Sequence, residues 1–231
     1  MSKPKVKLKP KATDEGFVSN VVFPTHIQSR TWDESETNRD LREGIWRERA
    51  LDPEGIYRSN ASGTWHSKDN IFGRLGPAGE RLHDMFGEAF VAYAYNALGA
   101  DPSMKCSVKL SAWAMVYSDG GYAAVHTHPN CHASGVYYVD DTTADTKATM
   151  ATGVSLKAGD IEFLDTRGLN CSAPNMKLMS SSIFHCVPGS MLVFQSNLPH
   201  YVHPVRGEGE RIAIACNATY LMHSNPKETN L

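Results

Sequence analysis

The spacing of hydrophobic and polar positions changes once along the chain, at about residue 105. Before that point, apolar residues recur every three or four positions in two segments, which predicts amphipathic helices over 33–49 and 79–97. After it, apolar and polar residues alternate, which is the period of a half-buried strand. The alternating runs are separated by glycine-containing turns. They predict eight strands, at about 106–117, 122–128, 134–139, 148–156, 160–164, 190–196, 200–205 and 211–221.

Three further stretches lie outside these elements. Residues 17–27 alternate like a strand and end in a turn at Pro24. Residues 52–75 are rich in Gly, Ser, Asn and Pro, which predicts an ordered loop with Trp65 as its anchor onto the core. Residues 166–186 predict a long polar loop, and long loops in compact domains often serve as lids.

Helices followed by a run of short strands predict a mainly β (α+β) fold. We expect a double-stranded β-helix, the cupin-like jelly roll, with the two N-terminal helices bracing one sheet. The chain would then divide into a disordered basic tail at 1–15, a helical and loop region packing on the sheet at 16–105, the jelly-roll catalytic core at 106–221 and a C-terminal tail at 222–231.

The composition is that of an ordinary globular domain: 231 residues, 41 % of them hydrophobic, with a formal net charge of −2. This charge gives no electrostatic basis for nucleic acid or an anionic membrane as the main partner. No apolar run is long enough to cross a bilayer. The five cysteines are scattered without a C-x-x-C pair, which predicts reduced thiols and a cytoplasmic location. The sequence carries no signal for an oligomeric state.

Two histidines in the β-rich half are candidate metal ligands. His126 and His128 end the apolar run that begins at Tyr122, immediately before a Pro129-Asn130 turn. Side chains two residues apart in a strand point to the same face, so both imidazoles can bind one metal ion. Asn130 is most simply a turn former, and it is also a candidate for contact with a bound cosubstrate or substrate.

A third ligand must come from a distant part of the chain. His200 follows a predicted strand and a short turn, and a jelly roll brings its second and seventh strands side by side. His203 lies on the opposite face of the same strand and His132 lies beyond Pro129, so both are weaker candidates. Arg211 opens the last predicted strand, and its planar guanidinium can bind a carboxylate with two charge-assisted hydrogen bonds.

These residues resemble a known family. A His-x-His pair, a distant histidine and an arginine eleven residues later form the pattern of the Fe(II)/2-oxoglutarate-dependent oxygenases with the double-stranded β-helix fold. The sequence is most similar to the 2-oxoglutarate/Fe(II) oxygenases found in bacteria and their phages. The similarity covers most of the chain, in the motifs FPTHI at 23–27, SGTWHS at 62–67, HTHPNCHASGVYYV at 126–139, EFLDTR at 162–167, PGSMLVFQSNLPH at 188–200 and ERIAIACN at 210–217.

The resemblance implies a reaction and roles for four residues. His126, His128 and His200 would bind Fe(II), and Arg211 would bind the distal carboxylate of 2-oxoglutarate. The implied reaction uses O₂ to convert 2-oxoglutarate to succinate and CO₂, coupled to hydroxylation of a small-molecule or peptide substrate. Three imidazoles also suit Zn, Cu or Ni, so the ligand set alone does not select the metal.

Two positions depart from the pattern of the superfamily. His128 stands where most members carry a carboxylate, which makes the metal site one charge unit more positive and favours a dianionic cosubstrate. Ala213 stands where many members carry a serine. A hydrogen bond to the cosubstrate carboxylate would then be missing, or a tyrosine would supply it, the candidates being Tyr117, Tyr137 and Tyr138.

Two other functions agree with the same residues. A three-histidine cupin dioxygenase would bind its organic substrate directly on the metal and would need no 2-oxoglutarate. A non-catalytic jelly-roll module would bind a sugar or a protein and need no metal. A role of Arg211 in binding 2-oxoglutarate would distinguish a 2-oxoglutarate-dependent oxygenase from the first alternative. Binding of a metal would distinguish it from the second.

Overall fold

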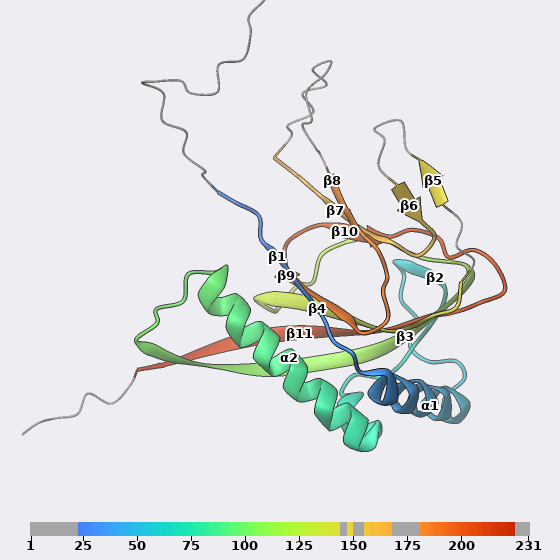
Figure 1. Cartoon of the computed structure of the whole chain (residues 1–231), viewed down its shortest axis with the longest axis horizontal. Helices are drawn as coiled ribbons and strands as arrows, with labels where there is room; N and C mark the ends of the chain where they lie inside the picture. The colour runs from blue at the N-terminus through green and yellow to red at the C-terminus, as the bar shows by residue number, and fades with distance from the viewer. Residues whose placement is uncertain (1–22, 144–146, 150–154, 168–180, 225–231) are drawn as a thin grey trace, which may run out of the picture.

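The computed structural model of the chain describes residues 23–143, 147–149, 155–167 and 181–224. Figure 1 shows both α-helices on one side of the long strands β3 and β11, with the short strands β7, β8 and β10 on the other side. The elements, in chain order, are β1 (Ile27–Thr31), α1 (Ser35–Leu51), β2 (Ala61–His66), the 3-10 helix η1 (Phe72–Arg74), α2 (Gly76–Asn96), β3 (Met104–His126), β4 (Ala133–Asp141), β5 (Lys147–Thr149), β6 (Ser155–Lys157), β7 (Ile161–Leu164), β8 (Ser181–Phe184), β9 (Ser190–Gln195), β10 (His200–Val202) and β11 (Arg211–Ser224).

All of the described strands except β5 and β6 belong to one nine-stranded sheet. Its order is β1-β9-β4-β11-β3-β10-β7-β8, and β2 pairs with β3 beside this path. The sheet curls around β3, because residues 104–117 of that strand pair with β11 whereas Ala123 and His126 pair with β10. A strand that passes between two halves of a curled antiparallel sheet is the arrangement of a jelly roll. The fold expected from the sequence is therefore confirmed.

The two helices cover one face of this sheet (Figure 1). The buried face of α2 presents Leu82, Phe86 and Phe90, and these side chains join one core cluster with inward residues of β3, β4 and β11. Successive strand residues point to opposite faces. Tyr137 of β4 therefore belongs to the helix-side core, whereas Tyr138 belongs to a second cluster on the other side. This other side is the face of the sheet that the two helices do not cover.

The predicted helices and most predicted strands are confirmed with shifts of a few residues. The helices over 33–49 and 79–97 are α1 and α2. The runs 106–117 and 122–128 form one continuous strand, β3, which ends at His126 and not at residue 128. The remaining predicted strands correspond, in order, to β4 (134–139), the pair β5 and β6 (148–156, of which 150–154 lie outside the described residues), β7 (160–164), β9 (190–196), the shorter β10 (200–205) and β11 (211–221).

Three strands differ from the sequence prediction. β2 lies within the predicted loop 52–75, and β8 lies within the predicted loop 166–186, of which 168–180 fall outside the described residues. Residues 23–26 lie outside any strand, which agrees with the turn expected at Pro24, but β1 begins at Ile27, where the predicted strand was to end; residues 17–22 are not described. Tertiary pairing explains β2: a Cβ on Gly63 would lie 2.8 Å from the Cα of Gly121 in β3, so two glycines allow the strands to approach.

The predicted tails fall mostly outside the described residues. Residues 1–15 are not described, and β11 continues to Ser224, so the first three residues of the C-terminal tail expected at 222–231 belong to this strand. The expected anchor role of Trp65 is confirmed, since this buried indole donates a hydrogen bond from Nε1 to the carbonyl oxygen of Asp52 at 2.8 Å. Among the described residues, no helix has the length and apolar character needed to cross a membrane.

Candidate metal centre and cavity

A cavity of about 530 Å³ lies on the face of the sheet turned away from the helices. Alternate residues of β3 and β11 line it, while the residues between them pack in the helix-side core. Where these two strands pair, the lining residues are Ser111, Trp113, Met115 and Tyr117 on β3 and Arg211, Ala215 and Asn217 on β11. Because side chains alternate along each strand, one half of them packs in the core and the other half lines the cavity.

Three histidines meet in this cavity, and their ligand nitrogens all lie within 4.8 Å of one another. His126 ends β3 and His200 begins β10, and the two are direct partners in the antiparallel ladder. The next paired residue of β10, Val202, faces Ala123, so between these two pairs two residues of β3 oppose one of β10. This bulge brings both Ala123 and His126 to the cavity face.

His128 reaches the cluster from outside any strand. The expectation that a strand carries both His126 and His128 is wrong, because β3 ends at His126. Instead, the backbone N–H of His128 donates to the carbonyl oxygen of Ser196, at 2.8 Å, which fixes this residue beside β9. The expected meeting of the two imidazoles is nevertheless observed, with ring centroids 5.2 Å apart.

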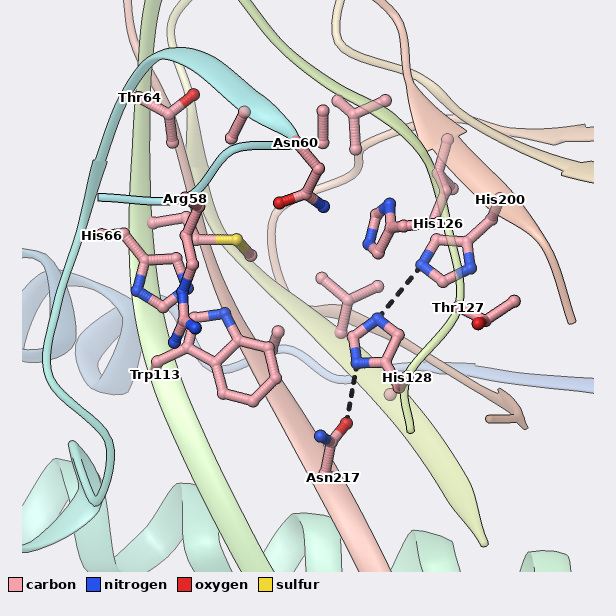
Figure 2. Close-up of a pocket in the computed structure, with 18 of the residues that line it drawn as sticks. Arg58, Asn60, Thr64, His66, Trp113, His126, Thr127, His128, His200 and Asn217 are labelled. Carbon is pink, nitrogen blue, oxygen red and sulfur yellow. Dashed lines mark hydrogen bonds between the residues drawn. The ribbon is translucent and has the colours of Figure 1, made fainter. Parts of the chain in front are cut away.

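Each of the three imidazoles has an oxygen acceptor at Nδ1, and Figure 2 shows the one that His128 has in Asn217. His126 bonds to the carbonyl oxygen of Ala124 at 2.7 Å, and His200 bonds to that of Leu198 at 2.9 Å. His128 bonds to the side-chain oxygen of Asn217 at 2.8 Å. Because these oxygens only accept, each Nδ1 carries the proton and each Nε2 keeps a lone pair. Neutral rings with a free Nε2 are the form in which histidine binds a metal.

Burial keeps these rings neutral. Desolvation lowers the pKa of His128 to about 4, and the nearby His126 lowers it further, whereas the hydrogen bond that His128 donates to Asn217 acts in the opposite direction. Desolvation likewise lowers the pKa of His200 to about 3 and lowers the pKa of His126. The Nε2 atoms of His128 and His200 lie 3.3 Å apart. Two lone pairs at that distance repel each other unless a cation lies close to both, so the donor set fits a metal ion.

Arg211 lines the same cavity and is 1 % exposed. Its Nε and Nη1 atoms have no hydrogen-bond partner, and it makes no salt bridge with a carboxylate of the described residues. The rings of Tyr117 and Tyr138 lie 4.8 Å and 5.0 Å from its guanidinium carbon. A buried charge without a carboxylate partner is costly, and this one faces a cavity that an anionic ligand can enter.

The three candidate tyrosines and Asn130 have different positions. Tyr138 has a buried hydroxyl without a partner beside Arg211, and Tyr117 covers the same guanidinium. Tyr137 is excluded, because its hydroxyl donates to the side-chain oxygen of Asn38 on the helix side, at 2.6 Å. Asn130 lines the cavity with a φ of 64°, which agrees with a turn-forming role.

The weaker histidine candidates lie outside the cluster. The imidazole of His203 bonds to the buried carboxylate of Glu162 at 2.8 Å, and His132 accepts a hydrogen bond from the backbone N–H of Tyr220 at 3.0 Å. Neither belongs to the only group of metal-ligating side chains found among the described residues.

Sequence reasoning missed two parts of the cavity. His66 stacks on Trp113, and Trp113 stacks in turn on His128, with centroids 5.6 Å and 5.9 Å apart. Asn217, the acceptor for His128, was also missed, although its position gave a signal. It lies six residues after Arg211 in β11, and an even spacing in a strand puts two side chains on one face.

Residues 111–217 match the sequence model of the family described as "Putative 2OG-Fe(II) oxygenase". The resemblance inferred from the motifs is confirmed for this core. The name of the family states its cofactors, iron and 2-oxoglutarate, and the three-histidine cluster fits such a metal. The sequence has no significant match among curated proteins.

Solved structures share the fold at low sequence identity. A prolyl-4-hydroxylase from Pseudomonas putida is 15 % identical with a TM-score of 0.59, over 84 % of this chain and 92 % of that one. A prolyl hydroxylase from Trichoplax adhaerens, in complex with a peptide fragment of the hypoxia inducible factor oxygen degradation domain, is 11 % identical with a TM-score of 0.58, over 84 % and 83 %. HygX from Streptomyces hygroscopicus, with nickel and 2-oxoglutarate bound, is 11 % identical with a TM-score of 0.52, over 84 % and 83 %.

Proposed function

We propose that the protein is a non-haem Fe(II)/2-oxoglutarate-dependent dioxygenase of the hydroxylase type. His126, His128 and His200 would bind Fe(II), and Arg211 would bind the distal carboxylate of 2-oxoglutarate. One observation carries the proposal: a buried arginine without a carboxylate partner lines the same cavity as three imidazoles with converging lone pairs. A ligand that is anionic at one end and chelates a metal at the other meets both requirements.

The metal would supply the activation of O₂, and the described residues would orient the cosubstrate. The guanidinium of Arg211 can donate two parallel hydrogen bonds to one carboxylate. Tyr138 has a free hydroxyl beside it, which can donate a third. We propose that this hydroxyl replaces the serine that is absent at Ala213. Asn130 is retained as a proposed contact of the cosubstrate because it lines the same cavity.

We propose that the substrate binds at the end of the cavity lined by Arg58, His66 and Trp113 (Figure 2). His66 uses Nδ1 to bond to the carbonyl oxygen of Ser67, which leaves Nε2 to accept a hydrogen bond. Within the described part of the chain, the side chain of Arg58 makes one long ion pair, with Asp69 at 3.9 Å, so it can also bind a polar substrate. The solved structures with this fold include one that holds a peptide and one that holds hygromycin B, and both classes of substrate are proposed.

We also propose a cytoplasmic location. The cysteines of the described residues are all free thiols, namely Cys106, Cys131, Cys186 and Cys216. Reduced thiols are typical of that compartment.

Anaerobic addition of Fe(II) and 2-oxoglutarate tests the proposal. We expect the weak visible charge-transfer band of the Fe(II)–2-oxoglutarate chelate in the wild-type protein. His126→Ala should abolish the band, because one of three ligands is lost. His203→Gln is the matched control: this histidine is bonded to Glu162 outside the cluster, and the band should persist.

The other two functions give different results in the same experiment. A cupin dioxygenase that binds its substrate directly would retain the metal but show no band with saturating 2-oxoglutarate. A non-catalytic module would contain no metal, and His126→Ala would then have no effect. Either result would overturn the proposal.

A further inference from the structure

His128 is held differently from the other two histidines. His126 and His200 bond through Nδ1 to main-chain carbonyl oxygens two residues before them. His128 instead bonds to a side chain, the amide of Asn217, which comes from β11. Its orientation and protonation pattern therefore depend on one replaceable residue.

The amide of Asn217 is itself oriented by Ser134. Asn217 and Ser134 are direct partners in the ladder between β11 and β4. The hydroxyl of the fully buried Ser134 donates to the side-chain oxygen of Asn217 at 2.9 Å. The same oxygen accepts from Nδ1 of His128 at 2.8 Å. Both contacts fall on the amide oxygen, so the amide presents its oxygen, and not its NH₂ group, to the imidazole.

This orientation decides which nitrogen of His128 carries the proton. With an oxygen at 2.8 Å, the proton is on Nδ1, and the lone pair of Nε2 faces Nε2 of His200 at 3.3 Å. In the other tautomer, an N–H on Nε2 would donate to His200. That hydrogen bond would occupy both of the lone pairs that a metal ion needs.

We propose that Asn217, oriented by Ser134, is the positioning residue that holds His128 in its metal-binding tautomer. A carboxylate at position 128 would need no such partner, because it has no tautomers and both of its oxygens accept hydrogen bonds. The Asn217–Ser134 pair is therefore what lets a histidine occupy a position at which most of the superfamily has an acid. The inference rests on the proposed function in one respect, that the three histidines bind a metal.

Long-range ¹H–¹⁵N spectra of the metal-free protein at pH 7.5 test the tautomer directly. We expect the wild-type His128 to carry its proton on Nδ1. Asn217→Leu should move the proton to Nε2 in most molecules, whereas Asn217→Asp keeps an acceptor and should retain the wild-type pattern. Asn60→Leu replaces another amide that lines the cavity and should leave His128 unchanged. Two results would overturn the inference. One is a wild-type His128 protonated on Nε2, and the other is an Asn217→Leu variant in which His128 keeps its proton on Nδ1.

Calorimetric titration with Ni(II) gives a second readout that does not depend on turnover. Loss of a hydrogen-bonding partner of a metal ligand typically lowers metal affinity about 10–100-fold. We expect that loss for Asn217→Leu, a smaller loss for Ser134→Ala, and near wild-type affinity for Asn217→Asp. Ser134→Ala also keeps the test valid if Asn217→Leu does not fold. Equal affinities in all variants would refute the positioning role, whereas a wild-type protein that binds no metal would refute the proposed function instead.

Discussion

The two faces of the central sheet contain the same strands but differ in how their polar groups are satisfied. Tyr137 and Tyr138 are neighbours in β4 and both are fully buried. On the helix face, the hydroxyl of Tyr137 donates to Asn38. On the cavity face, neither the hydroxyl of Tyr138 nor two nitrogens of Arg211 have a hydrogen-bond partner among the residues that the structure describes. The buried hydroxyl on the helix face thus has its hydrogen bond in the folded protein, whereas the buried polar groups on the cavity face need a ligand to supply theirs.

The two faces of the sheet therefore contribute differently, one to stability and the other to ligand binding. The helix face carries the larger of the buried apolar clusters, and its removal from water favours folding. The cavity face carries a buried charge and three desolvated histidines, which oppose folding. A truncation on the helix face should therefore lower stability without changing ligand affinity, whereas a change on the cavity face should alter ligand affinity.

The largest effect is expected on the helix face, from Phe86→Ala. Phe86 is fully buried and stacks on Phe90 with ring centroids 5.9 Å apart. Replacing a buried phenylalanine by alanine leaves a cavity and typically costs about 3–5 kcal/mol of folding free energy. Urea unfolding of the metal-free protein measures it. Ni(II) affinity of the folded variant should match the wild type, and a parallel loss of affinity would contradict the separation of the two faces.

Arg211→Met tests the cavity face. Two charge-assisted hydrogen bonds contribute about 1.5–3 kcal/mol each, so the affinity for 2-oxoglutarate should fall at least about 100-fold. Stability should stay equal or rise, because a buried unpaired charge is replaced by an apolar side chain of similar length. Calorimetric titration of the Ni(II)-loaded protein and thermal unfolding provide the two measurements. Arg206, which is exposed, gives the control Arg206→Met, with both quantities unchanged.

The pH dependence of stability should also be a property of the cavity face. Burial lowers the pKa of His128 to about 4 and that of His200 to about 3, below the unfolded value of about 6.5. As the pH falls below 6.5, the unfolded chain takes up protons that the folded chain does not, so stability decreases. Between pH 6.5 and 5, each of these histidines should cost on the order of 1–2 kcal/mol.

Urea unfolding of the metal-free protein over this pH range measures the slope. His128→Gln removes one titrating group and should flatten the curve below pH 6.5. An unchanged slope would mean that His128 remains protonated in the folded protein.

The smallest effect is expected from Gly159→Ala. Gly159 has a φ of +80°, and a Cβ there would lie 2.9 Å from Cδ of Arg211. The strained backbone should cost about 1 kcal/mol, and displacement of Arg211 should lower 2-oxoglutarate affinity several-fold. Gly76→Ala is a matched control, since its φ is +60° but no atom lies within 4 Å of its Cβ position. The stability of the Gly76→Ala variant should fall by a similar amount, while its affinity for 2-oxoglutarate stays at the wild-type value.

Much of the fold and the histidine cluster could be predicted because the signals are local. The change of period near residue 105 separates the helices from the strands, and His126, His128 and His200 lie beside strand ends and turns. By contrast, β2 forms from a glycine- and serine-rich segment only because β3 is available to pair with it. Pairing of that kind depends on tertiary contacts, which a reading of local propensity does not contain.

The site shows the same limit. The bulge that turns His126 into the cavity depends on the register between β3 and β10, and the stack of His66 on Trp113 depends on the pairing of β2 with β3. Neither has a signature in the spacing of residues. The role of Asn217 was predictable in part. Its spacing from Arg211 placed its side chain on the cavity face, but its hydrogen bond to His128 was not predictable, because His128 lies outside any strand.

The pairing of β10 with β3 has a consequence for how the fold is closed. β10 has three residues, yet it joins β7 and β8 to the rest of the curled sheet. A metal ion bound to His126, His128 and His200 would cross-link this junction between segments 74 residues apart, and so oppose its local opening. The free energy of metal binding would then also be free energy that keeps the sheet curled.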